Sequence, residues 1–357
     1  MPRIRDFGIT PGYLPTGPLN AITDVTGVRV GHTTIHRDVD GVSWRTGVTA
    51  IWPHAGNPLV ENIYAAVFPL NGLGEMTGRS LIDEWGLLGF PIMLTGTNSV
   101  GIVYHWTLQY LFEHCALEAG MTSLIAMVAE CDDSNLDGSK GMAIGREDVY
   151  AALDNAAGGP VIEGCVGAGT GMQLFGFKGG IGTSSRLVQA AGKPYTVGVL
   201  VLTNFGIQRE LIVNGIPVGR LLSKEELGAG QEGSCIVVLA TDAPLNHRQC
   251  ERMAKRAALG LARTGSTARD GSGEIIVAFA TGNIISSKAG PEISVRTLIE
   301  GSSDAGTSPL NGLFTAAVEA TEEAVYNALV SAETTRGAGG HVLEAISHER
   351  LRTLLQR

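Results

Sequence analysis

The sequence has 357 residues, of which 44% are apolar and 17% charged, so the chain can bury a large hydrophobic core and is not disordered. A net charge of −9 without any basic stripe argues against nucleic acid as a partner. The first 25 residues lack the apolar core of a signal peptide, and no segment has the roughly 18 uninterrupted apolar residues of a membrane span, so we expect a cytoplasmic protein with no membrane partner.

The chain is expected to form one domain over residues 1–357. No linker rich in proline and serine, charge block or low-complexity tract divides it, and only the loose, glycine-bearing segment at 223–233 interrupts the pattern. The cysteines are odd in number and lack CxxC spacing, which argues against a disulfide framework and against a zinc site. Reduced thiols are therefore expected at positions 115, 131, 165, 235 and 250.

Strands and helices are both well represented along the chain. In chain order, the sequence predicts a helix at 99–119, strands at 122–130, 195–204 and 234–241, a helix at 244–263, a strand at 274–281, a helix at 310–334 and a short amphipathic helix at the C-terminus. The strands are apolar almost throughout, which is typical of strands covered on both faces. A layered α/β fold follows.

The start of the helix at 244–263 carries two further signals. Asp242 can accept hydrogen bonds from the free amides of a first turn, and Pro244 has its φ already set for a helix start.

A glycine run and a histidine pair have the composition of ligand-binding motifs but not their structural context. The run Gly167–Gly171 has the composition of a dinucleotide loop, but it does not open a helix and lacks the βαβ context. His32 and His36 are four residues apart in a strand-like stretch, where that spacing does not place both side chains as a helical zinc motif would. We therefore expect neither a metal nor another cofactor.

The dipeptide Gly233-Ser234 stands between the loose segment and an apolar strand. Taken alone, it reads most simply as a turn leading into the strand. The alternative is a self-cleavage site: if this bond breaks, Ser234 carries a hydroxyl nucleophile and a free α-amine on one carbon. The unperturbed pKa of such an amine is roughly 7.7 to 8.0, so it can act as the base near neutral pH.

Several long sequence blocks resemble one peptidase family. NAITDVTGVRVGHTTI, PIMLTGTNSVG, VGAGTGMQLFGFKGGIGTSSR, GSCIVVLATDAPL and EAVYNALVSAETTRGAGG together resemble the DmpA-type L-aminopeptidase/D-esterases and the β-peptidyl aminopeptidases, nearly from end to end. The resemblance implies a four-layer αββα sandwich like that of N-terminal nucleophile hydrolases, with different connectivity, an architecture shared with ornithine acetyltransferases. It also implies autocleavage into 1–233 and 234–357, followed by assembly of the processed heterodimers into a homo-oligomer, expected to be a tetramer.

The resemblance assigns a catalytic role to Ser234 as nucleophile and to three further residues. Asn204 closes an apolar strand, where a fixed side-chain amide can donate to the oxyanion of a tetrahedral intermediate, although a turn-forming asparagine fits the same position. Ser272 and Glu274 are two positions apart at a strand start, so their side chains point the same way and could orient the hydroxyl and α-amine of Ser234. Spacing alone is equally compatible with a solvent-facing turn before an acidic strand start.

The resemblance further makes Glu130 the residue that binds the free amine of the substrate. A carboxylate at the rim of a buried strand can serve as that anchor, or it can be an ordinary surface residue. Some members of the family have an aromatic residue two positions later, where this chain has Asp132, and the extra negative charge could favour substrates with a second cationic group. Asn71 and Glu75 are read as loop scaffolding beside the pocket.

These inferences together predict a self-processing serine aminopeptidase or amidase. It would release an N-terminal L-, D- or β-amino acid from small peptides, amides or esters through an acyl-enzyme on Ser234. An acyltransferase on the same architecture is the alternative nearest in chemistry, although ornithine acetyltransferases use a threonine nucleophile. An unprocessed binding or structural oligomer is a third possibility. The presence of Ser234, Asn204, Ser272 and Glu274 together argues against it.

Overall fold

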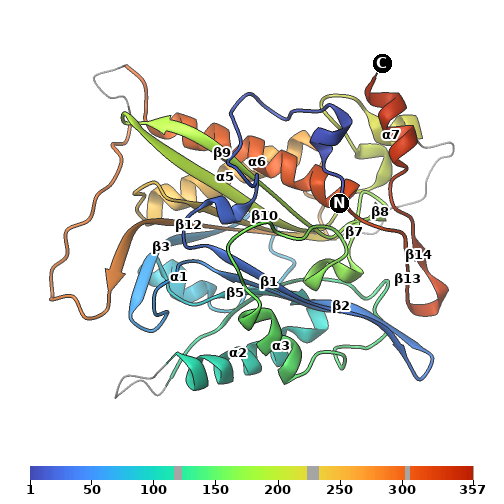
Figure 1. The fold of residues 1–357 in the computed structure, drawn as a ribbon, viewed down its shortest axis with the longest axis horizontal. Helices are drawn as coiled ribbons and strands as arrows, with labels where there is room; N and C mark the ends of the chain where they lie inside the picture. Colours follow the sequence, from blue (N-terminus) through green and yellow to red (C-terminus); the bar gives the residue numbers. More distant parts are fainter. Residues whose placement is uncertain (116–122, 223–232, 302–305, 357) are drawn as a thin grey trace.

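Two β-sheets lie face to face in the centre of the molecule, with helices covering both outer faces (Figure 1). The computed structural model describes residues 1–115, 123–222, 233–301 and 306–356. Within that part of the chain, no helix is long and apolar enough to cross a membrane.

The first sheet has four strands in the order β1-β2-β5-β6. These strands are β1 (Arg29–Val39), β2 (Val42–Trp52), β5 (Ile92–Gly96) and β6 (Met127–Cys131). β1 and β2 form a long antiparallel hairpin, whereas β5 and β6 are parallel.

The second sheet has six strands in the order β4-β3-β12-β11-β10-β9. These strands are β3 (Glu61–Pro69), β4 (Leu87–Leu88), β9 (Ile181–Ala190), β10 (Lys193–Asn204), β11 (Ser234–Thr241) and β12 (Gly273–Ser286). β11 and β12 are parallel neighbours at the middle of this sheet, and every residue of β11 is buried. Short pairs lie outside the two sheets: β7 (Gln173–Leu174) with β8 (Phe177–Lys178), and β13 (Thr335–Arg336) with β14 (Val342–Leu343).

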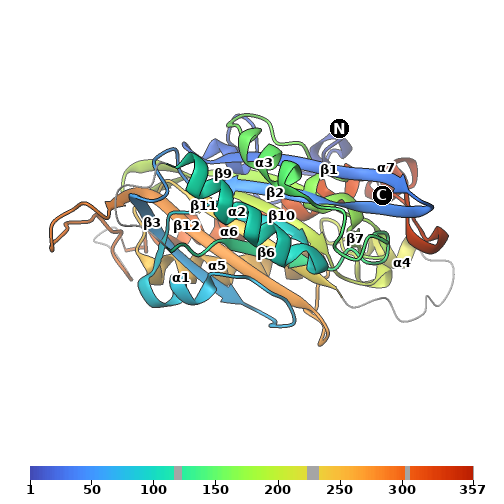
Figure 2. The ribbon, with the colours of Figure 1, turned by 90° about the horizontal axis from the view of Figure 1, so that it is seen from below.

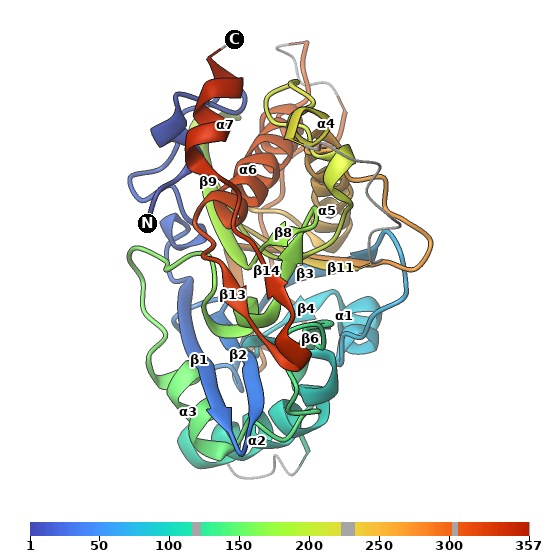
Figure 3. The same ribbon diagram turned by 90° about the vertical axis from the view of Figure 1, so that its right-hand side faces the viewer.

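Each sheet is covered by its own pair of helices. α2 (Val100–His114) and α3 (Arg146–Asp154) lie across the outer face of the first sheet, as Figure 2 shows. α5 (His247–Arg263) and α6 (Leu310–Val330) pack on the outer face of the second sheet. α1 (Arg79–Trp85) and α4 (Val218–Leu222) are shorter, and α7 (His348–Leu355) follows the β13–β14 pair near the C-terminus (Figure 3).

The buried side chains form three hydrophobic clusters, one between each pair of adjacent layers. The middle cluster joins the two sheets, and the outer clusters join each sheet to its helices. Successive residues of β11 alternate between clusters: Val237 and Leu239 face α5 and α6, whereas Ile236 and Val238 face the other sheet. The structure therefore confirms the predicted αββα sandwich, and the continuous apolarity of β11 reflects burial on both faces.

The element predictions differ from the structure mainly at the ends. β11 has the predicted bounds, and β10, β12, α2, α6 and α7 lie where elements were expected. The strand expected at 122–130 begins only at Met127, and its first expected residue lies outside the described residues. The predicted start of α5 is wrong: Asn246 is the N-cap and exchanges hydrogen bonds with Gln249, while the Asp242 carboxylate accepts from the Thr196 amide of β10 instead.

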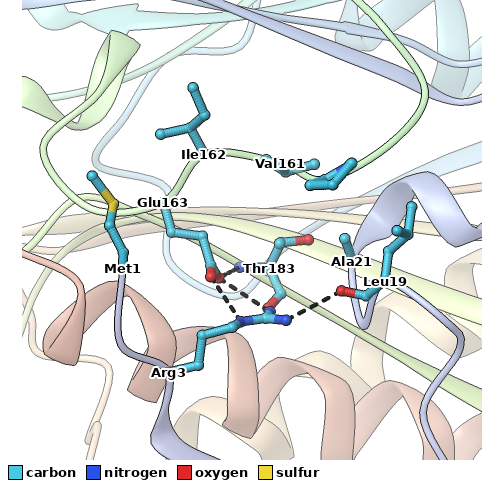
Figure 4. A pocket seen from close by; sticks show the side chains of 9 residues that line it. Met1, Arg3, Leu19, Ala21, Val161, Ile162, Glu163 and Thr183 are labelled. Carbon is cyan, nitrogen blue, oxygen red and sulfur yellow. Dashed lines mark hydrogen bonds and ion pairs between the residues drawn. The ribbon is translucent and has the colours of Figure 1, made fainter.

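The N-terminal segment is anchored by buried ion pairs. In a pocket of about 390 Å³, the Arg3 guanidinium pairs with Glu163 at 2.8 Å and donates to the carbonyl oxygens of Leu19 and Thr183 (Figure 4).

Deeper in the protein, Arg186 is fully buried between β9 and α6. Its guanidinium pairs with Glu319 at 3.1 Å and with Glu323 at 2.7 Å.

Candidate active site

Ser234 lies at the first position of β11, where two neighbouring strands bring the other expected residues beside it. In the antiparallel pair with β10 its partner is Asn204, and in the parallel pair with β12 its partner is Gly273. Ser272 and Glu274 flank Gly273 in the chain. The sheet register therefore gathers four predicted residues that are up to 70 positions apart in the sequence.

Gly233 occupies a position that no other residue fits. A Cβ at Gly233 would lie 1.7 Å from the backbone oxygen of Asn204, which is impossible without moving the strand. Its carbonyl oxygen accepts a hydrogen bond from the Gly273 amide at 3.3 Å. The carbonyl group that Ser234 would attack in a self-cleavage reaction is thus held by the Gly273 amide of β12, while the α-carbon of Gly233 packs closely against Asn204 of β10.

The Asn204 amide is fixed by hydrogen bonds at both ends. Its Oδ1 accepts from the Gln173 amide at 3.1 Å, and its Nδ2 donates to the Asp132 carbonyl oxygen at 2.9 Å. An amide group has two N–H donors, so one donor remains after the bond to Asp132. Asn204 is buried and preorganised, as an oxyanion donor needs to be.

Ser272 and Glu274 form a buried pair next to Ser234. The Ser272 hydroxyl donates to Glu274 Oε1 rather than to Ser234. Burial raises the pKa of Glu274, while the hydrogen bond from Ser272 acts in the opposite direction. Since Ser234 Nα is still a peptide nitrogen in the intact chain, the α-amine that this pair would orient is not yet formed.

Glu130, at the end of β6, brings the first sheet into the site. Its side chain is only 4% exposed, yet both oxygens have partners: Oε1 accepts from the Glu75 amide at 2.8 Å, and Oε2 accepts from the Thr97 hydroxyl. A Cβ at Gly74 would lie 3.4 Å from Glu130 and 3.6 Å from Gly273, so this loop passes between the two sheets at the site. The carboxylate is therefore held in a fixed position opposite Ser234.

One cleft of about 740 Å³ connects these residues. Ser234, Gly233, Glu130 and Asp132 all line it, together with the loop at 72–75 and residues 97–98. Asp132 is exposed, whereas Glu130 and Ser234 are largely buried. The cleft thus joins the expected nucleophile to the expected amine anchor.

The loop residues expected to act as scaffolding do so by different contacts. Asn71 Nδ2 donates to the carbonyl oxygens of Ala268 and Arg269, which ties the loop after β3 to the loop before β12. Glu75 contributes its backbone amide to Glu130 and is exposed at the cleft.

The glycine run at 167–171 is structural. It forms a fully buried 3₁₀ helix against β2, where a Cβ at Gly167 or Gly169 would clash with neighbouring atoms, and no phosphate could reach it. Below it, the buried Lys178 ammonium donates to three carbonyl oxygens, those of Gly169, Met172 and Gly179. These bonds fix the backbone that leads to Gln173 and hence to Asn204.

The histidines of β1 have no metal-binding arrangement. His32 Nδ1 is hydrogen-bonded to the Thr49 hydroxyl at 2.9 Å, and burial lowers the pKa of His32 to about 4. Across the described residues, no group of three or more acidic, histidine or cysteine side chains could hold a metal ion. All five cysteines are free thiols.

Three contacts of the site were not predicted from the sequence. They are the Gly273 amide on the Gly233 carbonyl, the Thr97 hydroxyl on Glu130, and the support of Asn204 by Gln173. Thr97 lies in a block quoted for the family resemblance, which could have drawn attention to it. The other two contacts depend on the pairing of distant strands, for which the chain has no local signal.

The stability of the protein should depend on pH through Asp133, a buried residue between the cleft residues Asp132 and Ser134. Burial, together with the nearby carboxylates of Asp137 and Asp132, raises the pKa of Asp133 to about 7, against 3.8 for a free side chain. The contribution of protonated Asp133 to the free energy of unfolding is fully present below pH 3.8 and is lost as the pH rises through 7.

Asp133→Asn should therefore flatten the pH dependence of stability between pH 4 and 7. At pH 8 it should raise the free energy of unfolding by a few kcal/mol, because the amide needs no ionisation in the buried site. Urea unfolding at a series of pH values measures this, with Asp40→Asn, at the exposed β1–β2 turn, as the matched control. Parallel pH profiles for wild type and Asp133→Asn would contradict the prediction.

Comparison with known proteins agrees with the fold and identifies the class of enzyme. Residues 20–343 match the model of peptidase family S58. The chain is 42% identical to the β-peptidyl aminopeptidase BapA of Sphingosinicella xenopeptidilytica, covering 99% of this chain and 91% of that protein.

Two solved structures share the whole fold. One is a β-aminopeptidase from a Burkholderia species, with a TM-score of 0.90 and 41% identity, covering 99% of this chain and 98% of the other. The second is the L-aminopeptidase D-Ala-esterase/amidase of Ochrobactrum anthropi, described as a prototype of the serine aminopeptidases and a variant of the Ntn hydrolase fold. It has a TM-score of 0.90 and 38% identity, covering 100% of this chain and 98% of the other.

The sandwich, its strand-end serine and these likenesses define a serine aminopeptidase with an Ntn-hydrolase type of fold. The chain belongs to peptidase family S58.

Proposed function

We propose that this aminopeptidase cleaves its own Gly233-Ser234 bond and then uses Ser234 to release N-terminal residues from small peptides, amides or esters. The observation that carries the proposal is the position of Ser234 between Asn204 and Gly273 at one end of a cleft that also contains Glu130. This arrangement supplies a nucleophile, two kinds of oxyanion donor and an anchor for an ammonium group.

In the first reaction, Ser234 Oγ attacks the carbonyl carbon of Gly233. The oxygen of that carbonyl accepts from the Gly273 amide, which stabilises the negative charge as it develops. The C–N bond then breaks as the nitrogen takes up the proton that the hydroxyl has lost, leaving an ester between Gly233 and Ser234 Oγ. Water hydrolyses the ester and yields two chains, 1–233 and 234–357, the second with a free α-amine on Ser234.

In the second reaction, that α-amine serves as the base for its own hydroxyl. Its ordinary pKa of roughly 7.7 to 8.0 suits proton transfer near neutral pH, and the Ser272–Glu274 pair would orient it. Ser234 Oγ attacks the carbonyl carbon of the first substrate residue, and the oxyanion accepts from Asn204 Nδ2. The leaving amine or alcohol takes the proton, and water then hydrolyses the acyl-enzyme.

Glu130 would restrict the enzyme to substrates with a free amine. The carboxylate is nearly buried, so a substrate without an ammonium group would leave it without a charged partner in the closed complex. The β-peptidyl activity in the names of the relatives supports N-terminal β-amino acids as one substrate class for this chain, besides L- and D-residues.

Assembly and location complete the proposal. A homo-oligomer is supported by large apolar side chains at the surface, such as Trp85 at 68% and Ile299 at 58% exposure. A cytoplasmic location is supported by the five free thiols, which persist in a reducing compartment.

The direct test is N-terminal sequencing and mass spectrometry of the purified protein. We expect a second fragment that begins Ser-Cys-Ile-Val at Ser234, together with release of alanine or β-alanine from its p-nitroanilide. Native mass spectrometry of the same sample reports the assembly. A full-length chain without amidase activity would contradict the proposal.

Removal of the oxyanion donor gives a quantitative prediction. Asn204→Ala should lower kcat by roughly 10²- to 10³-fold with little change in KM, because the lost hydrogen bond forms mainly in the transition state. Steady-state kinetics on an alanyl p-nitroanilide measure it, with the exposed Asn155→Ala as control. A rise in KM at constant kcat would instead assign Asn204 to ground-state binding.

A further inference from the structure

The cleft next to Ser234 is lined by acidic groups from separate segments. Glu75 comes from the loop after β3, Glu130 from β6, and Asp132 from the segment that follows β6. Among the residues that the structure describes, none of those lining the cleft is a lysine or an arginine. The pocket that receives the substrate therefore has a strongly negative potential that no cation in its lining neutralises.

Glu130 and Asp132 differ in what their carboxylates can do. Glu130 is 4% exposed and is held by the Thr97 hydroxyl and the Glu75 amide, as a fixed anchor for one ammonium group. Asp132 is exposed to the cleft, and its Oδ1 accepts from the Ser134 amide at 2.9 Å. A second cation could reach Asp132 without displacing any buried contact of Glu130.

The backbone sets the separation of the two carboxylates. Glu130 is in β6 and Asp132 directly follows the end of that strand, so their Cα atoms are at most about 7 Å apart, and both residues line the cleft. Four methylenes separate the α-carbon and the ε-amine of a lysyl residue, a reach that suits this spacing. A substrate whose first side chain is shorter or uncharged would leave the Asp132 carboxylate without a cationic partner in the complex.

Asp132 is also tied to the reacting end of the cleft. Its carbonyl oxygen accepts the hydrogen bond that orients Asn204, whose strand partner is Ser234. A substrate with its amine at Glu130 and its first carbonyl group between Ser234 and Asn204 thus has its first side chain near Asp132.

We infer that Asp132 is a specificity-determining residue that favours substrates whose N-terminal residue has a second cationic group, such as lysyl, ornithyl or β-homolysyl amides. This inference rests on the proposed function, since it takes Ser234 as nucleophile and Glu130 as amine anchor.

The test compares kcat/KM for lysyl, norleucyl and alanyl p-nitroanilides. Norleucine has the aliphatic chain of lysine without the amine, so the Lys/Nle ratio isolates the charge. For wild type we expect the Lys/Nle ratio of kcat/KM to be about 5 at low ionic strength. It should fall toward 1 at a salt concentration of about 0.5 M, since an exposed ion pair is weak and is screened by salt.

Asp132→Asn should abolish most of the Lys/Nle preference. The amide oxygen can still accept from Ser134, and the backbone contact to Asn204 is unaffected, so the substitution removes the charge alone. Asp40→Asn removes the same charge at the β1–β2 turn, outside the cleft, and asparagine tolerates the φ of 51° there, so its ratio should equal that of wild type.

The outcomes separate this inference from the proposed function. Activity on the alanyl substrate with an equal Lys/Nle ratio in wild type and Asp132→Asn would overturn the role of Asp132 and leave Ser234 as nucleophile. A wild-type preference for norleucine would overturn it as well. Absence of activity on all three substrates would contradict the proposed function, and this inference with it.

Discussion

Ser234→Ala is expected to give a full-length chain with amidase activity reduced by about 10⁴-fold or more. Without the hydroxyl there is no atom to attack the Gly233 carbonyl, so neither the new α-amine nor the acyl-enzyme can form. Gel electrophoresis under denaturing conditions reports the cleavage, and steady-state kinetics report the activity. Loss of both is the result expected for one shared nucleophile, and retention of either would contradict it.

The matched control is Ser80→Ala, at an exposed position of α1, which should be processed and fully active. Folding must also be compared, because the side chain of Ser234 is 8% exposed. Replacement of a hydroxyl by hydrogen leaves the packing of β11 unchanged, so the far-ultraviolet spectrum should match that of wild type. Two fragments from Ser234→Ala would rule out autocleavage by this residue.

Arg186→Met is expected to lower the free energy of unfolding by about 3 to 5 kcal/mol. The substitution leaves the carboxylates of Glu319 and Glu323 buried without their shared cation, which is far more costly than loss of a surface pair. Although burial opposes its ionisation, hydrogen bonding from Arg5 and the charge of Arg186 lower the pKa of Glu323 below its ordinary value. Chemical denaturation at a fixed protein concentration measures the effect.

The pH dependence gives a second readout for Arg186→Met. A lowered folded-state pKa means that the stabilisation from Glu323 is present above its unfolded pKa and is lost as pH falls through the folded value. The deficit of Arg186→Met should therefore be largest at neutral pH and shrink in acid. Arg79→Met is the control, since Arg79 and Asp83 are an exposed pair worth at most about 0.5 kcal/mol. Equal losses for the two variants would contradict the account.

The central strands of the fold could be predicted from the sequence because burial on both faces makes them continuously apolar. β11 is the clearest case, with its bounds correct at both ends. The start of α5 was predicted wrongly because Asp242 and Pro244 are as suitable locally as Asn246, whereas in the structure Asn246 caps the helix and the Asp242 carboxylate accepts from the Thr196 amide. For the N-terminal hairpin β1–β2, the sequence indicates only a strand-like stretch around His32.

The site residues were predicted in part for reasons that the sequence contains. Ser272 and Glu274 share a direction because they are two apart at a strand start, and the structure places them together. The proximity of Asn204 to Ser234 follows from the register of β10 against β11, which no local pattern specifies. The family resemblance predicted that Asn204 and Ser234 act together, which sequence spacing does not indicate. The catalytic roles of all four residues remain predictions.

The strand order of the second sheet determines what a cut at Gly233 would do to the molecule. The C-terminal fragment would supply β11 and β12, which lie between β3 and β10 of the N-terminal fragment. The two fragments would therefore be interleaved: separating them would require breaking hydrogen-bonded ladders on both sides at once. Either fragment made alone would present long apolar strand edges, which favour aggregation. Cleavage would thus yield two covalent chains that persist as one folding unit.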